Sequence, residues 1–211
     1  MSKVTIAGDV NGTGVFTIAA PNGNTNRTLV LPDEAGTIDT LQRAGNVLQV
    51  VNFVTTDKGS VVAGVASVDT TLSPDIFKTI TPVGNNSKFL VQVRWNGEAT
   101  HGSQWNSGWN ILRDGNRINS SGNNSWDSIQ SPSLNYTSVD NDSTGEGMTT
   151  FVLDTTGSTS GISTTYRLAI SNNQNITATI FTNRLFNAST ANGAIGYEVW
   201  SSEMIITEIA G

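Results

Sequence analysis

The stretch Lys88-Phe89-Leu90-Val91-Gln92-Val93-Arg94-Trp95-Asn96 carries the strongest structural signal in this sequence of 211 residues. Phe89, Val91, Val93 and Trp95 stand at alternate positions, so in an extended chain they would share one face. β-Branched and aromatic side chains at a period of two are typical of a strand with one buried face. We therefore predict a central β-strand over residues 88–96.

Comparable stretches recur on both sides of this strand, separated by clusters of Gly, Asn, Ser and Pro that favour turns. Asp114-Gly115, between two apolar runs, is the strongest hairpin signal in the chain. Further strands are expected over residues 47–54, 61–68, 76–81, 108–113, 149–154, 164–170, 175–181 and 197–209. About eight to ten short strands without a helical period predict an all-β protein whose residues 47–211 form a jelly-roll-like antiparallel β-sandwich.

The composition agrees with this fold class and excludes several kinds of function. Thr, Asn, Ser and Gly make up nearly half of the chain, and only 13% of the residues are charged. The formal net charge is -6, which argues against binding to nucleic acid, because neutralising phosphates requires a basic face. The chain contains no cysteine, which excludes disulfides, thiolate nucleophiles and cysteine-ligated metals.

Residues 1–40 differ from the rest and are expected to form a small N-terminal β module for attachment or oligomerisation. Three short alternating stretches are separated by turn clusters, and so short a segment buries too little apolar surface to be stable alone. Residues 41–46 are the expected linker to the β-sandwich. The N-terminus lacks the apolar region of a secretory signal, and no apolar run is long enough to cross a membrane. Synthesis in the cytoplasm without membrane insertion is therefore expected.

Two sets of short motifs resemble bacteriophage virion proteins. Residues 16–21 and 27–38 carry the patterns TI-x-AP and TLVLPDEAGT, which are similar to N-terminal modules of tail fibres and other virion proteins. Ile80-Thr81-Pro82, Ile111-Leu112-Arg113-Asp114-Gly115 and Ile205-Ile206-Thr207-Glu208-Ile209 resemble, in this order, the β domains that end many phage fibres. The resemblance implies a homotrimeric virion component made in the host cytoplasm. Most fibres carry a long shaft that this chain lacks, so a short tail fibre, a baseplate appendage and a head-decorating trimer all remain open.

The tryptophans supply the candidate ligand-binding residues. Trp95 and Trp109 lie on expected strands and are predicted to pack in the core. Two others fall in expected loops beside amide side chains, and a flat aromatic face with amide and hydroxyl donors suits a glycan. The candidate glycan-binding residues are Trp105, Asn106, Asn123, Asn124 and Trp126. The alternative is that the loop tryptophans also pack in the core or in an interface.

Two further sets of residues are candidates for attachment and for metal binding. Residues 140–145 match the first half of a calcium loop, but Phe151 stands where the bidentate glutamate is expected. A solvated acidic loop is the alternative to calcium binding. The candidate calcium ligands are Asp140, Asp142, Thr144 and Glu146, and the candidate residues for attachment to another virion protein are Phe16, Ile18, Leu29 and Leu31.

The sequence contains no nucleophile elbow, zinc-protease motif or phosphate-binding loop. His101 lies in a Gly/Ser-rich stretch, where it is either an ordinary surface histidine or, in a trimer, one of three ligands to an axial metal. We therefore expect a non-enzymatic virion protein without a cofactor other than calcium. The leading interpretation is a short trimeric tail fibre, attached through residues 1–40 and contacting a host-surface glycan. A trimeric capsid-decorating protein is the second interpretation, and a carbohydrate-binding module outside any virion is the third.

Overall fold

A computed structural model describes most of the region expected to form the β-sandwich. The described residues are 11–13, 15, 17, 22–23, 26, 28, 43–63, 69–99, 107–118, 145–172, 178–186 and 199–211. The chain divides into two compact units, Met1–Ile38 and Asp39–Gly211. The fold described below is that of the second unit.

Antiparallel strands build this unit, and none of the described residues forms a helix. Accordingly, no membrane-spanning helix occurs within the ranges given above. The strands are β1 (Val47–Thr55), β2 (Gly59–Ala63), β3 (Thr70–Thr71), β4 (Phe77–Ile80), β5 (Lys88–Ala99), β6 (Ser107–Arg113), β7 (Asn116–Arg117), β8 (Glu146–Asp154), β9 (Thr164–Asn172), β10 (Ala178–Thr182) and β11 (Ser202–Ile209).

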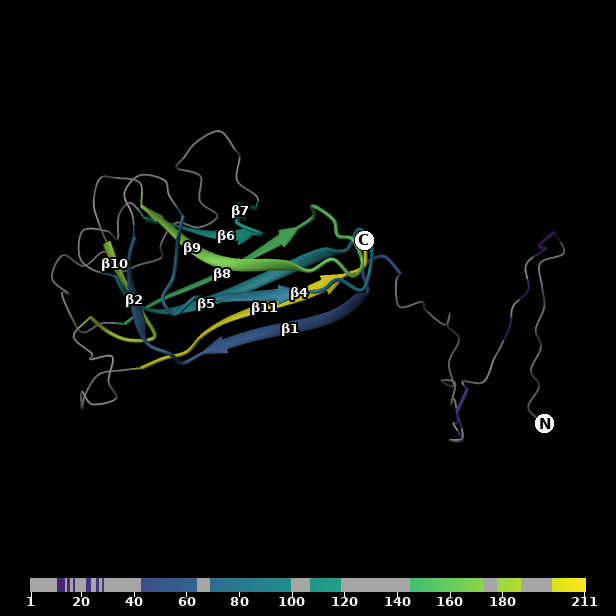
Figure 1. The fold of residues 1–211 in the computed structure, drawn as a ribbon, viewed down its shortest axis with the longest axis horizontal. Coiled ribbons are helices and arrows are strands. Elements are labelled where there is room, and N and C mark those ends of the chain that lie inside the picture. The colour runs from purple at the N-terminus through teal and green to yellow at the C-terminus, as the bar shows by residue number, and fades with distance from the viewer. Residues whose placement is uncertain are drawn as a thin grey trace. The chain divides into compact units, whose positions relative to one another are not determined.

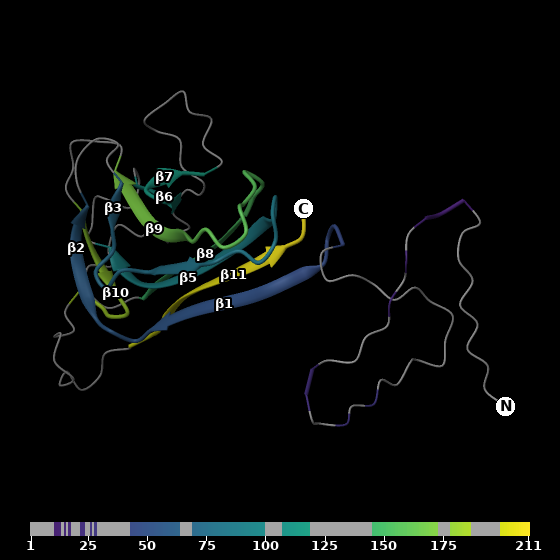
Figure 2. The same cartoon turned by 45° about the vertical axis from the view of Figure 1, so that its right-hand side comes forward.

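The strands form two sheets that pack face to face, which confirms the expected all-β sandwich (Figure 1). In the large sheet, β5 is central: β8 pairs with one of its edges, while β11 and then β10 pair along the other. β1 extends this sheet beyond β11, and β2 extends it beyond β10. In the small sheet, β9 pairs with β6 on one side and with β3 and β4 on the other. Figure 2 shows β6, β7 and β9 stacked over β1, β5 and β11.

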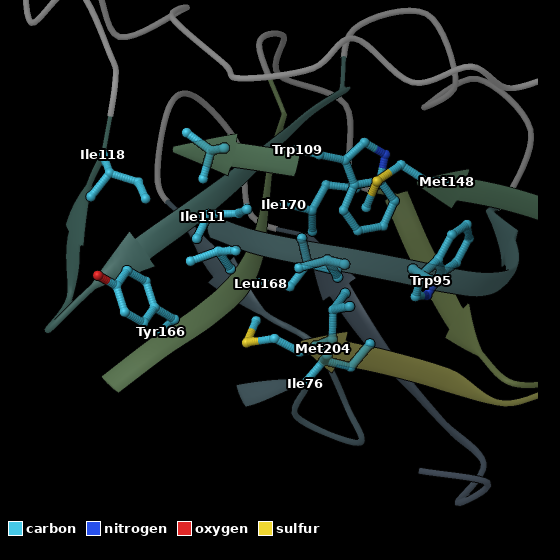
Figure 3. Close-up of a cluster of buried hydrophobic side chains, with 14 of the residues drawn as sticks. Ile76, Trp95, Trp109, Ile111, Ile118, Met148, Tyr166, Leu168, Ile170 and Met204 are labelled. Carbon is cyan, nitrogen blue, oxygen red and sulfur yellow. The ribbon is translucent and has the colours of Figure 1, made fainter. Parts of the chain in front are cut away.

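The core lies between the sheets and contains the alternating residues of the central strand. Phe89, Val91, Val93 and Trp95 are all at most 1% exposed, as the sequence pattern predicts. The ring centroids of Trp95 on the large sheet and Trp109 on the small sheet are 4.8 Å apart. The two indoles therefore pack against each other between the sheets (Figure 3). Burial of large aromatic and aliphatic side chains of this kind supplies the main driving force for folding. The prediction that both tryptophans are core residues is confirmed.

The predicted hairpin at Asp114-Gly115 is confirmed as well. Both residues have positive φ, 50° and 86°, which is the geometry of a two-residue type I′ turn. The turn joins β6 to β7, with Leu112 paired to Arg117. Asp114 also accepts hydrogen bonds from Thr165 N (2.8 Å) and Thr164 Oγ1 (2.6 Å), which fix the turn against β9.

Several strands differ from the expectation, and β5 and β8 are each three residues longer than expected. β11 begins at Ser202, several residues later than predicted, and only an isolated bridge between Arg184 and Val199 precedes it. β3 was not expected, because a two-residue strand has no detectable period. β2 covers Gly59–Ala63, and the rest of the stretch predicted over 61–68 lies outside the described residues.

Candidate functional site

The outward-facing side of the large sheet is the most unusual surface of the described residues. The strand register places Val50, Thr207, Leu90 and Leu153 in one row across β1, β11, β5 and β8. The next outward row contains Asn52, Ile205, Gln92 and Phe151. These two rows are called the outer face below.

Apolar side chains dominate the centre of the outer face. Phe151 is 71% exposed, Val50 57% and Leu153 44%, while Leu90 and Ile205 are half-buried. A sheet that packs on one side and meets water on the other normally carries polar residues at its outward positions. A contiguous exposed apolar patch is instead typical of a surface that another protein covers.

The outer face carries little net charge. Between the apolar side chains lie the neutral Asn52, Gln92 and Thr207. The adjoining row carries an exposed ion pair, in which Arg94 Nη2 lies 3.5 Å from Glu203 Oε1. An exposed pair at this distance stabilises the fold little, but it neutralises both charges at the border of the patch. The face is therefore suited to contact with an uncharged, largely apolar surface.

A buried polar network ties the two sheets together at one end of the sandwich. Asp154, at the end of β8, is 1% exposed. Its Oδ2 accepts hydrogen bonds from Tyr166 Oη (2.6 Å) and Arg113 Nη1 (2.9 Å). Its Oδ1 accepts hydrogen bonds from Thr156 N (2.9 Å) and Oγ1 (2.6 Å). The charge of Asp154 is thus compensated by two residues of the small sheet and by the loop after β8.

A polar cavity of about 330 Å³ adjoins this network, with a lining of mostly hydroxyl and amide groups. Several of these groups bind one another: Arg113 Nε donates to Thr164 Oγ1 (3.2 Å), and Arg113 Nη2 donates to Gly157 O (2.8 Å). Because the hydrogen-bonding groups of Arg113 and Thr164 are used within the protein, we assign them to holding the loop after β8 in place. The residues that line the cavity are Asn86, Arg113, Asp114, Thr156, Gly157, Ser158, Thr159, Ile162, Ser163 and Thr164.

A second buried carboxylate anchors the turn between β4 and β5. Glu208 is fully buried and accepts hydrogen bonds from Ser87 Oγ (2.7 Å) and Gln49 Nε2 (2.6 Å). It also accepts hydrogen bonds from the backbone N–H groups of Val83 and Gly84. This carboxylate holds a turn in place, and its oxygens are occupied by protein donors.

Most residues predicted to form sites lie outside the described ranges. This applies to the glycan candidates Trp105, Asn106, Asn123, Asn124 and Trp126, to the attachment candidates Phe16, Ile18, Leu29 and Leu31, to His101, and to the calcium candidates Asp140, Asp142 and Thr144. Their predicted roles stay predictions.

Glu146 is the one predicted site residue that the structure describes. It lies at the start of β8, and its Oε2 accepts a hydrogen bond from Ala99 N at 3.0 Å. Within the described part of the chain, no three acidic or histidine side chains gather closely enough to hold a metal ion. Calcium binding through Glu146 and residues 140–144 therefore stays a prediction.

Sequence reasoning missed the outer face and Trp200. The apolar residues of the face belong to strands that were predicted correctly, but alternation alone does not show which outward positions lie in one patch. Trp200 lies two, four and six positions before the buried residues Ser202, Met204 and Ile206. Strict alternation along a strand would therefore place its side chain in the core. It is only half-buried, because the strand begins after it.

No protein-family model matches the chain, and a search of curated proteins finds no relative. The functional argument therefore depends on the residues themselves.

Proposed function

We propose that the protein is a non-enzymatic, homotrimeric structural component of a bacteriophage virion. The observation that carries this proposal is the apolar outer face, in which Val50, Phe151 and Leu153 are exposed on one side of the large sheet. Leaving such side chains in water is unfavourable, and covering them with another protein surface removes that cost. A structural assembly explains the face more directly than a solitary soluble domain does.

A second copy of this chain is the proposed partner on the outer face. Each copy carries a formal net charge of -6, so copies repel unless they meet through neutral surfaces. The outer face itself carries no charged side chain, and the charges of Arg94 and Glu203 in one adjoining row are paired, while Lys88 is the charge beside the other row. The number of copies, three, is taken from the resemblance to phage fibre proteins.

Within the virion, the leading assignment is a short tail fibre. Residues 1–40 would attach it to another virion protein, and the β-sandwich would project and contact a glycan of the host surface. The motifs in residues 16–38 and 80–115 support this assignment through their similarity to fibre proteins. A capsid-decorating trimer is the second assignment, in which the same face would pack copies together on the shell.

Light scattering on the purified full-length chain tests the assembly. The chain mass is 22.3 kDa, and the proposal requires three times this mass at micromolar concentration. A monomer would overturn the trimer and favour an isolated carbohydrate-binding module.

Antibody-gold labelling of purified phage particles tests the location. Gold at the tail supports a fibre, and gold over the capsid supports the decorating protein. A known virion protein, labelled on the same particles, is the control. If the control is labelled and this protein is not, the virion assignment is overturned.

A further inference from the structure

A cleft of about 560 Å³ opens at one end of the outer face. It lies where the residues after β1, the outward residues of β5 and the segment leading into β11 meet. Its volume is in the range of ordinary ligand-binding clefts. The cleft is lined by Thr56, Lys58, Arg94, Asn96, Val199, Trp200 and Ser201.

Trp200 provides a fixed aromatic wall. Its backbone is held by a hydrogen bond from Trp200 N to Asn183 O (3.4 Å), next to the bridge between Val199 and Arg184. Its six-membered ring packs against Gly145, where an added Cβ would overlap Cζ2 and Cη2 of the indole. The indole is therefore positioned before any ligand binds. A positioned flat apolar surface suits the carbon-bound hydrogens of a sugar ring.

Asn96 provides a fixed amide beside the indole. Its Nδ2 donates to Ser201 O at 2.6 Å, and its backbone N donates to Ser202 Oγ at 3.1 Å. One of these bonds orients the side-chain amide, which has a second N–H and a carbonyl oxygen for further bonds. Together with the hydroxyls of Thr56 and Ser201, the cleft offers the neutral polar groups that sugar hydroxyls require.

Two cationic side chains, Arg94 and Lys58, line the cleft, and none of its lining residues that the structure describes is a carboxylate. Arg94 contacts Ser201 Oγ (3.4 Å) and Glu203 (3.5 Å) through Nη2. Both two-pronged edges of a guanidinium include Nη2, which makes these contacts, but the N–H groups of Nη1 can still donate a hydrogen bond to one carboxylate oxygen.

We propose that this cleft binds the carboxylated sugar unit of an acidic polysaccharide. The sugar ring stacks on Trp200, its carboxylate binds Arg94 with Lys58 nearby, and its hydroxyls bind Asn96. The choice of a surface polysaccharide as the source of the ligand rests on the proposed virion function, whereas the binding chemistry does not. The residues of this cleft are different from the predicted glycan-binding residues Trp105 and Trp126.

Isothermal titration calorimetry of the full-length protein with trigalacturonic acid, at concentrations up to about 5 mM, tests the proposal. Its fully methyl-esterified form is the matched ligand, because it keeps the rings and removes the charge. The expected result is binding of the acid at least about tenfold tighter than binding of the ester. Equal affinities, or no binding of the acid at this concentration, would overturn the proposal.

Substitutions of the residues that line the cleft test whether the acid binds there. Trp200→Ala and Arg94→Ala should each weaken binding of the acid about tenfold or more, and Trp200→Phe should restore part of the loss. Lys88→Ala, an exposed cation on the same strand, and Phe77→Ala, a partly exposed aromatic elsewhere, are the controls and should keep wild-type affinity. Circular dichroism and light scattering on each variant separate lost binding from lost folding or assembly. Wild-type affinity in a folded Trp200→Ala variant would overturn the assignment.

The outcome is independent of the proposed function. If the protein is a trimer and antibody-gold detects it on phage particles, but it binds neither the acid nor the ester, the proposed binding site is overturned. The virion assignment then still holds. A chain that binds the acid through Trp200 but is absent from particles overturns the virion assignment and leaves the cleft standing.

Discussion

Tyr166 and Asp154 link the two sheets through a hydrogen bond of 2.6 Å between the phenol and Oδ2 of the carboxylate. Tyr166 belongs to β9 of the small sheet, and Asp154 ends β8 of the large sheet. Burial of the phenol, together with its bond to Asp154, raises the pKa of Tyr166 well above its ordinary value. The raised pKa keeps the phenol protonated, and therefore donating, at neutral and moderately alkaline pH.

Tyr166→Phe removes this donor and leaves the ring in place. The expected cost is about 1.5–3 kcal/mol of unfolding free energy, because a bond to a charged, buried acceptor is lost. Urea unfolding measures the change. Ser163→Ala is the control: it removes an exposed bond to Thr81 Oγ1 and should cost less than about 0.5 kcal/mol. Equal unfolding midpoints for wild type and Tyr166→Phe would contradict the role assigned to this bond.

The two buried carboxylates predict loss of stability in acid. Burial alone would raise the pKa of Asp154, but hydrogen bonds from Thr156 and Tyr166 and the charge of Arg113 outweigh it and lower the pKa. For Glu208, burial is likewise outweighed by bonds from Gln49, Ser87 and the backbone of residues 83–84. A folded-state pKa below the unfolded value stabilises the protein above the unfolded pKa, and this contribution is lost as pH falls through the folded pKa.

The urea midpoint should therefore fall as the pH drops below about 4, near the ordinary pKa of Asp and Glu. Asp75 opposes this loss, since burial raises its pKa more than the charge of Arg167 lowers it. Glu208→Gln should lower the midpoint at pH 7 and flatten its decline in acid. A wild-type midpoint that stays constant from pH 7 to the acid side of both pKa values would refute the prediction.

Gly97 marks a position where backbone must approach backbone. A Cβ at Gly97 would overlap Phe181 O and lie 2.6 Å from Trp95 Cζ2, at the point where β5 pairs with β10. Gly97→Ala should cost more than about 3 kcal/mol, because the neighbouring atoms belong to a paired strand and a buried indole. Thermal and urea unfolding measure this loss.

Gly147→Ala is the matched control in the neighbouring strand. An added Cβ there lies 3.2 Å from Asn96 Oδ1, which belongs to a side chain, and the backbone is not in the left-handed region. The change should lie within about 1 kcal/mol of wild type, since alanine also loses less conformational entropy on folding than glycine. Equal losses for the two variants would show that the close approach at Gly97 is not the cause.

The sequence alone predicted the elements that have a local physical signature. Phe89, Val91, Val93 and Trp95 mark their strand because alternation separates buried from exposed positions, and Asp114-Gly115 marks its hairpin because both residues tolerate positive φ. The pairing of β5 with β8, β10 and β11 was not predictable, since contacts between distant segments leave no local period.

The candidate sites were harder to predict for the same reason. Glu208 occupies a buried position of its strand, and only the turn at residues 83–87 reveals how its charge is compensated. The residues that line the cleft with Trp200 come from three separate segments, so no spacing in the sequence brings them together. Predictions from the resemblance to phage fibre proteins, such as the expected trimer, are untouched by these contacts and require measurement.

The outer face yields the prediction that bears most directly on assembly. The triple variant Val50→Thr, Phe151→Thr and Leu153→Thr removes exposed apolar side chains but keeps residues that favour strands. If copies pack through this face, the mass in light scattering should fall from three chains to one at the same concentration. The unfolding free energy of the separated sandwich should change little, because these side chains contribute little to its own core.

Ile162→Thr and Val83→Thr are the matched controls, since both side chains are exposed and lie outside the outer face. Combined in one variant, they should leave the mass of the assembly unchanged. If the controls dissociate as readily as the triple variant, general loss of surface hydrophobicity is responsible and the face has no special role. If the triple variant keeps the full mass while wild type is trimeric, the copies meet through a different surface, and the apolar rows across β1, β11, β5 and β8 require another partner.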